Sequence, residues 1–247
     1  MCYSLSVLSP KETIRARFNV TAPEGEDHPQ YYYVSAFDYP RLPVITGASP
    51  DLLSYFRWGL IPPWVKTVEE AEQFRQKTMN ARAESIYEKP AFRHAAATQH
   101  CLVVVDGFFE WQEVHGHKYP YYLRLKTREP FALAGLWDVW TNPQSKVSVS
   151  TVSIVTCAAS PLLAVIHNTA LRMPVILPRA VERRWIEPGL SQQQAEVLLV
   201  AFPDELLEAF TVAKLDPSHT NANTPAAITP YRYPELASSA LGQASLF

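Results

Sequence analysis

Cys101-Leu-Val-Val-Val-Asp-Gly-Phe-Phe-Glu-Trp111 is the stretch that decides the fold. Its first five residues, 101–105, form a continuous apolar run of strand length, which indicates a strand buried on both faces. Residues 108–114 and 119–126 then predict a hairpin that turns around His115-Gly116-His117-Lys118. The middle of the chain is therefore expected to be rich in β-structure.

Further short strands are predicted on both sides of this stretch, at residues 4–7, 31–34, 43–45, 54–60, 131–140, 147–156 and 173–177. Helices are predicted after Thr67, where Thr67 and Glu70 have the spacing of a capping box, and at Ser160-Pro161, 180–186 and 191–200. This order favours a single α+β domain over alternating βαβ units. No glycine-rich loop follows a predicted strand, which argues against Rossmann and P-loop nucleotide-binding enzymes. Residues after Lys214 are expected to form an extended arm.

The composition limits the class of protein. The chain has 247 residues, 47% of them hydrophobic, which is enough for a substantial core. Its net charge of −2 disfavours a generally basic nucleic-acid binder but permits a local basic groove. Three cysteines and no signal peptide or long apolar segment predict a soluble, intracellular, cytoplasmic protein without a disulfide framework, associated with the nucleoid when it binds DNA.

The N-terminal pair Met1-Cys2 offers a distinct chemistry. If Met1 is removed, Cys2 carries an α-amine and a thiol whose ordinary pKa values lie near ~8 and ~8.5. Such a pair condenses with an aldehyde to an imine and then to a thiazolidine ring. The same residue can instead act as an N-terminal nucleophile on an acyl group. A third interpretation is that Cys2 is only a small buried apolar residue.

Two segments contain aromatic and polar candidates, and each candidate has a structural alternative. Trp58 and Trp64 flank Gly-Leu-Ile-Pro-Pro and are either core residues or a wall on which a base stacks. Asn80 either caps a helix C-terminus or offers its amide to a reacting oxygen. Arg82 either pairs on the surface near Glu84 or binds a phosphate through its planar guanidinium.

Two further segments contain titratable candidates. Glu110 lies between Phe109 and Trp111, and burial there would raise its pKa and suit it to proton transfer. His167 is either a hydrogen-bonded core histidine or an acid or base beside Arg172.

No cofactor or metal is expected. His115 and His117 have no matching third ligand in the sequence, so a metal site at the hairpin is disfavoured. Cys101 and Cys157 lie in apolar strands and are expected to be buried packing thiols.

Taken in order, five motifs resemble those of the SRAP family (SOS response-associated peptidases, or abasic site processing proteins). They are Met1-Cys2, the Trp-Gly-Leu-Ile-Pro-Pro-Trp run that ends at Trp64, Asn80-Ala-Arg-Ala-Glu84, Asp106-Gly-Phe-Phe-Glu-Trp111, and His167 followed by Arg172-Met-Pro-Val-Ile-Leu. The resemblance covers about residues 1–236, which we expect to form one domain followed by a tail at 237–247. It implies a barrel-like core of mostly antiparallel strands with peripheral helices, and a groove for single-stranded DNA.

The resemblance also implies a function and its residues. Cys2 would form a covalent crosslink with the opened sugar of an abasic site after loss of Met1, by aminopeptidase or by autoproteolysis. Asn80 would hold the sugar, Glu110 would move protons at the amine and thiol and assist reversal, and His167 would protonate the sugar ring oxygen. The DNA-binding positions would be Arg82, Arg172, Trp64, Trp58, Thr156 and Ser35. The partner would be single-stranded DNA with abasic sites, bound by a monomer without membrane association.

Two departures from the family pattern stand out. Most relatives begin Met-Cys-Gly-Arg, whereas Tyr3-Ser4 follows Cys2 here, and the spacing from His167 to Arg172 is longer than usual. Two other functions remain open from the sequence. One is an N-terminal-nucleophile thiol peptidase or amidase that acts on other substrates, and the other is a non-catalytic nucleic-acid adaptor.

Overall fold

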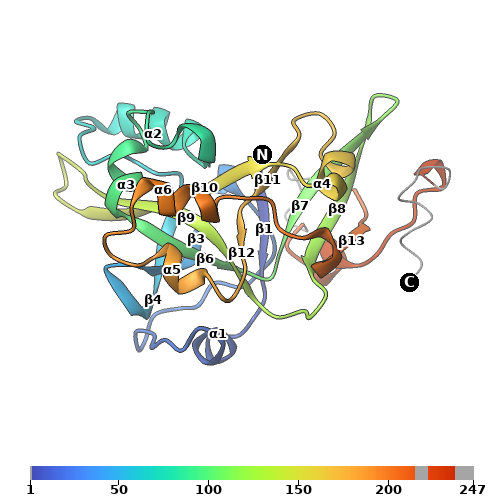
Figure 1. Cartoon of the computed structure of the whole chain (residues 1–247), viewed down its shortest axis with the longest axis horizontal. Helices are drawn as coiled ribbons and strands as arrows, with labels where there is room; N and C mark the ends of the chain where they lie inside the picture. The colour runs from blue at the N-terminus through green and yellow to red at the C-terminus, as the bar shows by residue number, and fades with distance from the viewer. Residues whose placement is uncertain (1, 215–221, 237–247) are drawn as a thin grey trace.

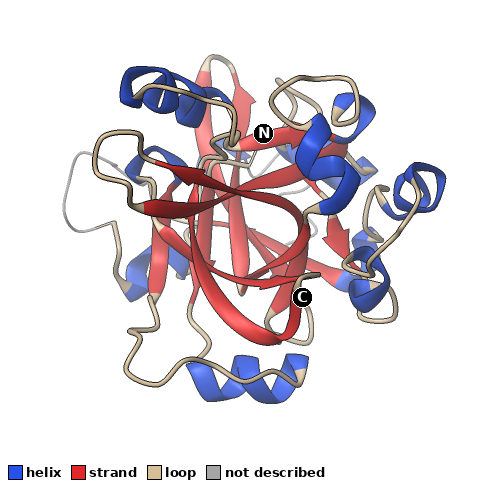
Figure 2. Cartoon of the chain, turned by 90° about the vertical axis from the view of Figure 1, so that its left-hand side faces the viewer, coloured by secondary structure: helices blue, strands red, loops and turns tan. Residues whose placement is uncertain are grey.

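A closed β-barrel forms the centre of the protein in the computed structural model, which describes residues 2–214 and 222–236. The ring runs β10–β4–β3–β6–β9 and closes through pairing of β9 with β10. Its strands curve around a common interior (Figure 2). Only the β4–β10 pair within this ring is parallel. The barrel strands are β3 (Arg41–Thr46), β4 (Ser49–Trp58), β6 (His100–Val105), β9 (Phe131–Thr141) and β10 (Ser148–Ala158).

Three short strands extend the barrel at its edges: β5 (Asn80–Arg82) and β11 (Arg172–Pro174) both pair with β10, and β12 (Ile176–Leu177) pairs with β9. Every residue of β6 is buried, as its apolar run predicts. Burial on both faces follows because β6 borders the barrel interior on one side and packs against helices α3 and α5 on the other.

A second sheet lies beside the barrel and is antiparallel where its pairs are described (Figure 1). Its order is β13–β8–β7–β1–β2. In Figure 1, β7, β8 and β13 lie to one side of β1, and the barrel strands lie to the other. The strands are β1 (Ser4–Val7), β2 (Tyr31–Ser35), β7 (Gly107–Val114), β8 (His117–Leu125) and β13 (Leu207–Thr211).

Helices surround the two sheets. Thr67 Oγ1 accepts a hydrogen bond of 3.1 Å from Glu70 N and so caps α2, as the sequence predicts. Among the described residues no helix is long and apolar enough to cross a membrane. The α-helices are α1 (Lys11–Phe18), α2 (Val68–Lys77), α3 (Arg93–Thr98), α4 (Pro161–Ile166), α5 (Glu182–Trp185) and α6 (Gln192–Leu198). The 3-10 turns are η1 (Ala36–Asp38), η2 (Ala83–Ser85), η3 (Asp204–Leu206), η4 (Pro225–Ile228) and η5 (Pro234–Leu236).

The predicted α+β class with a barrel-like, mostly antiparallel core is confirmed. Some local predictions were wrong. The hairpin turn is tighter than expected, because Val114 already pairs with His117. Asn80 lies at the start of a strand rather than at a helix end. Helices α1 and α3 were not predicted, and the predicted tail at 237–247 and residues 215–221 of the arm lie outside the described residues.

Candidate active site

The four predicted catalytic residues come together at the seam between the barrel and the second sheet. Cys2 lies two residues before the start of β1, and Glu110 lies in β7, the neighbour of β1. Asn80 begins β5 at the edge of the barrel, opposite Ile154 of β10. His167 ends α4, which packs against β7. The fold therefore joins residues that lie far apart in the sequence.

Asn80 holds the chain at Cys2. Its side-chain Nδ2 donates a hydrogen bond of 2.9 Å to the Cys2 carbonyl oxygen, and the residue is only 9% exposed. The other end of the amide, Oδ1, is buried and has no hydrogen-bond donor among the residues that the structure describes. A buried acceptor of this kind is costly unless a ligand or water donates to it. The amide therefore both positions Cys2 and offers an acceptor beside it.

The Cys2 thiol is completely buried, with Sγ 3.8 Å from the Ser4 carbonyl oxygen. Burial raises its pKa well above the ordinary value, and the charge of Glu110 acts in the same direction. The thiol is thus protonated at neutral pH. Its reaction as a nucleophile requires a neighbouring group that removes the proton.

Glu110 is a candidate for this proton transfer, because its charge acts on the Cys2 thiol. Its side chain is 2% exposed, and burial raises its pKa to about 8. Its Oε2 lies 3.2 Å from His167 Nδ1. A carboxyl group with this pKa exists in both protonation states near neutral pH, so it can give a proton and take it back.

His167 is neutral at the same pH, because burial lowers its pKa to about 4. Its Nδ1 also lies 2.8 Å from the Arg172 carbonyl oxygen, which can only accept a hydrogen bond. Nδ1 therefore carries the ring proton and Nε2 has a lone pair. In this neutral form Nε2 can accept a proton but cannot donate one, so the expected role of proton donor to the sugar oxygen would require the ring to be protonated first.

A surface cavity of about 410 Å³ opens onto this pair. Glu110 and His167 form part of its wall, and Ser35 at the end of β2 also lines it. The remaining lining residues are Tyr3, Ser4, Tyr33, Phe37, Asp38, Trp111, Glu113, Lys118 and Thr169.

Arg172 forms an ion pair with the carboxylate of Glu84. Its guanidinium donates two hydrogen bonds to Glu84, of 2.6 and 2.9 Å, and one of 2.6 Å to the Thr156 carbonyl oxygen. These bonds hold the pKa of Glu84 below its usual value. Arg82 is exposed and pairs with Thr156 across β5 and β10. The structure thus gathers Arg82, Arg172 and Thr156 around the same end of β10, and a phosphate would compete with Glu84 for Arg172.

The two candidate tryptophans, Trp64 and Trp58, differ clearly in their exposure to solvent. Trp64 is 48% exposed and packs edge-on against Phe74 of α2, so one side of its ring faces solvent. Trp58 has no exposed surface and donates from Nε1 to the Met79 carbonyl oxygen at 2.8 Å. The prediction that Trp58 contacts DNA does not fit this burial. The Thr156 side chain is also completely buried and can act only through Arg172.

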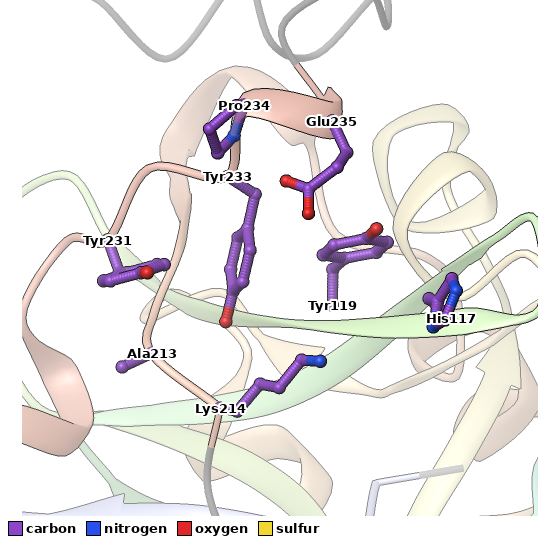
Figure 3. Close-up of a pocket in the computed structure, with 8 residues that line it drawn as sticks. All are labelled: His117, Tyr119, Ala213, Lys214, Tyr231, Tyr233, Pro234 and Glu235. Carbon is purple, nitrogen blue, oxygen red and sulfur yellow. The ribbon is translucent and has the colours of Figure 1, made fainter.

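No three metal-ligating side chains gather within residues 2–214 and 222–236. A larger cavity of about 540 Å³ lies where the start of β8 meets the C-terminal segment, and it contains none of the predicted site residues. Figure 3 shows Tyr119 of β8 and Tyr233 in its wall, with the Lys214 and Glu235 side chains beside them.

Sequence reasoning missed three residues of the site. Tyr3 and Phe37 line the cavity with Glu110 and His167, and Glu84 binds Arg172. The position of Tyr3 next to Cys2 is a signal that the sequence contains. Phe37 and the Glu84–Arg172 pair depend on contacts between distant segments, which no local pattern reveals.

The comparisons with known proteins agree with one another. The model of the SOS response associated peptidase (SRAP) family matches residues 1–215. The abasic site processing protein YoqW of Bacillus subtilis is 34% identical over 91% of this chain and 97% of its own length. The abasic site processing protein HMCES of Xenopus tropicalis is 30% identical over 58% of this chain and 47% of its own. A crystal structure of a protein from Bacteroides thetaiotaomicron has a TM-score of 0.85 and 33% identity, and covers 94% of this chain and 100% of its own.

The pKa of Glu110 can be tested through stability. The folded protein keeps the Glu110 proton up to about pH 8, whereas an unfolded chain releases it near ~4.3. The fold is therefore weakened progressively as pH rises between these values. Glu110→Gln should raise the free energy of unfolding by about 5 kcal/mol above pH 8, and by little at pH 4. Urea denaturation across this pH range measures the difference. Glu113→Gln, on the partly exposed end of β7, is the control, and an equal pH dependence in both variants would contradict the assignment.

Proposed function

This chain belongs to the SOS response associated peptidase family, and we propose that it processes abasic sites in single-stranded DNA by covalent capture through Cys2 once Met1 is removed. The names of its relatives support abasic-site processing as the general activity. The single observation that carries the finer proposal is the buried Glu110 carboxyl group, with a pKa of about 8, at the seam that also holds the Cys2 thiol.

The proposed reaction joins Cys2 to the opened sugar. The free α-amine of Cys2 attacks the aldehyde carbon, and the resulting carbinolamine loses water to form an imine. Sγ then adds to the same carbon of the protonated imine, and the thiol gives up its proton to a base. The product is a thiazolidine, and the balance is one aldehyde and one cysteine giving one ring and one water.

The protonation states at the site suit this sequence. The protonated Glu110 supplies a proton for the departure of water, and the resulting carboxylate then takes the thiol proton from Cys2. His167 accepts the hydroxyl proton of the closed sugar when the sugar opens, because its Nε2 has a lone pair. Asn80 holds Cys2 in place and presents Oδ1 to the sugar hydroxyl.

The same protonation states weaken the case for a thiol peptidase that acts on other substrates. Such enzymes need a thiolate, which a cationic neighbour usually stabilises. Here burial and the charge of Glu110 both raise the pKa of the Cys2 thiol. Imine formation begins at the amine instead, so a protonated thiol does not prevent the first step.

The first prediction concerns the covalent bond itself. Cys2→Ala should abolish the stable crosslink, and Cys2→Ser should give only a labile adduct, since an oxygen replaces the thiol. A chain that retains Met1 should also fail, because an amide nitrogen cannot form the imine. Intact-mass measurement after incubation with an abasic oligonucleotide tests all three. Cys157→Ala, at a thiol of β10, should crosslink normally. A heat-stable crosslink in Cys2→Ala would exclude the proposal.

The second prediction separates the two titratable residues. Glu110→Gln keeps the shape of the side chain but cannot exchange protons, so it should slow crosslink formation by about 10²-fold and slow release even more. His167→Ala should slow formation and leave the release rate nearly unchanged, because it acts before the ring closes. Formation and release are measured separately on one oligonucleotide. If the Glu110→Gln crosslink releases DNA at the wild-type rate, Glu110 has only a structural role.

The third prediction concerns phosphate binding and is measured in a Cys2→Ala background to prevent capture. Arg82→Ala should weaken binding to single-stranded DNA and reduce its salt dependence by about 0.7 in log–log slope for each lost phosphate contact. Glu84→Gln should have the opposite effect, because it releases Arg172 from its paired carboxylate. Glu208→Gln, which breaks an Arg124 pair on the second sheet, is the control. If Glu84→Gln and Glu208→Gln bind DNA alike, Arg172 does not contact a phosphate.

A further inference from the structure

An exposed aromatic side chain stands at the edge of the cavity. Phe37 is 61% exposed, although a large apolar side chain is normally buried. One face of its ring stacks on Tyr3, with the ring centroids 5.3 Å apart and the planes inclined by 30°. The Tyr3 and Phe37 rings therefore form a small stack, in which Tyr3 packs against one face of Phe37.

The backbone holds this stack in place. Ala36 N donates a hydrogen bond of 2.8 Å to the Tyr3 carbonyl oxygen, so the turn that carries Phe37 is tied directly to residue 3. Ser35 Oγ accepts a hydrogen bond of 3.2 Å from Phe37 N. Tyr39 N closes the turn on the Ala36 carbonyl oxygen at 3.0 Å. Phe37 is therefore presented by an ordered turn, which reduces the entropy lost when a ligand binds.

The stack lies in the same cavity as the proposed proton carriers. Tyr3 and Phe37 line it together with Glu110 and His167. Tyr3 also follows Cys2 directly, and adjacent Cα atoms are only about 3.8 Å apart. A nucleotide attached to a sugar at Cys2 would thus begin within reach of these rings.

We propose that Tyr3 and Phe37 form a stacking platform for the nucleobase next to the abasic site. This inference rests on the proposed function, and it adds how the neighbouring nucleotide is recognised. An abasic nucleotide has no base of its own to stack, so the adjacent base is the nearest flat aromatic surface that the DNA can offer. Aromatic side chains bind bases in this way without reading their hydrogen-bonding edges.

Stacking has a signature that differs from that of phosphate binding. Purines have a larger ring surface than pyrimidines, so a purine neighbour should be favoured. The contribution should also persist at high salt, since no counterions are released. Arg82 would give the reverse pattern, with a contribution that falls as salt increases.

The test measures crosslink formation at subsaturating protein concentration. Each oligonucleotide carries one abasic site whose neighbour, on either side, is a purine, a pyrimidine or a spacer without a base. The wild-type protein should react fastest with a purine on one of the two sides. Phe37→Ala should form the crosslink with that purine substrate about fivefold to tenfold more slowly, at both low and high salt. It should react with the spacer substrate at the wild-type rate.

Matched variants distinguish stacking from apolar bulk. Phe37→Tyr should retain the purine preference, whereas Phe37→Leu should lose it. Val197→Ala, an exposed apolar position on α6, should behave as the wild type. The platform is overturned if Phe37→Ala keeps the purine preference, or if it slows the spacer substrate as much as the purine substrate.

The failure of the platform and the failure of the proposed function give different results. A wild-type protein that captures abasic DNA without any dependence on the neighbouring base overturns only the platform. A wild-type protein that captures none overturns the proposed function. The platform is then tested by binding to intact oligopurine and oligopyrimidine strands: a purine preference that Phe37→Ala removes supports it, and equal binding by both proteins overturns it.

Discussion

The passage of the chain from β6 into β7 is the constraint on which the site depends, because it joins the barrel to the second sheet. The Asp106 carboxylate accepts hydrogen bonds from Leu8 N at 2.5 Å and from Ser9 N at 2.9 Å, and it thereby fixes the chain that leaves β1. Gly107 is required at the next position, since a Cβ atom there would lie 2.4 Å from the Tyr122 ring. With β1 held along β7, Cys2, two residues before β1, is brought near Glu110, and Asn80 of the barrel hydrogen-bonds to it.

Burial at this seam shifts the pKa values of Glu110 and His167 in opposite directions. It raises the pKa of Glu110 to about 8 and lowers that of His167 to about 4, so both are neutral across the intervening pH range. A protonated acid and an unprotonated base then coexist 3.2 Å apart, which two groups with ordinary pKa values would not do at neutral pH. The arrangement lowers the stability of the fold, because each group would be more stable in its charged form if water surrounded it. Such a cost is common where a site must hold particular protonation states.

Much of the fold follows from local sequence patterns, whereas the site follows from pairings that the sequence does not display. Apolar runs identify β6 and most other strands, and the aromatic neighbours of Glu110 already indicate its burial. Helix α1 was missed because only Ile14 and Phe18 are buried along it and no side chain caps it. Asn80 was assigned to a helix end because its strand is defined by a parallel pairing with β10, more than 70 residues away. The position of the Arg172 guanidinium depends in the same way on Glu84, from which it is separated by 88 residues.

A chain with a net charge of −2 must hold a polyanion by other means than bulk attraction. Several arginines already form ion pairs: Arg172 at the site with Glu84, and elsewhere Arg41 with Glu26 and Arg75 with Glu72. Each ion pair lowers the gain from a phosphate contact, because the existing carboxylate must be displaced or tolerated. Exposed aromatic rings such as Phe37 and Trp64 do not compete with these carboxylates. The proposed covalent capture would further reduce the need for strong reversible binding, since a brief encounter that places an aldehyde beside an amine would be enough to retain the DNA. Under this proposal, stacking that orients the strand would contribute more to the reaction than charge that only attracts the strand.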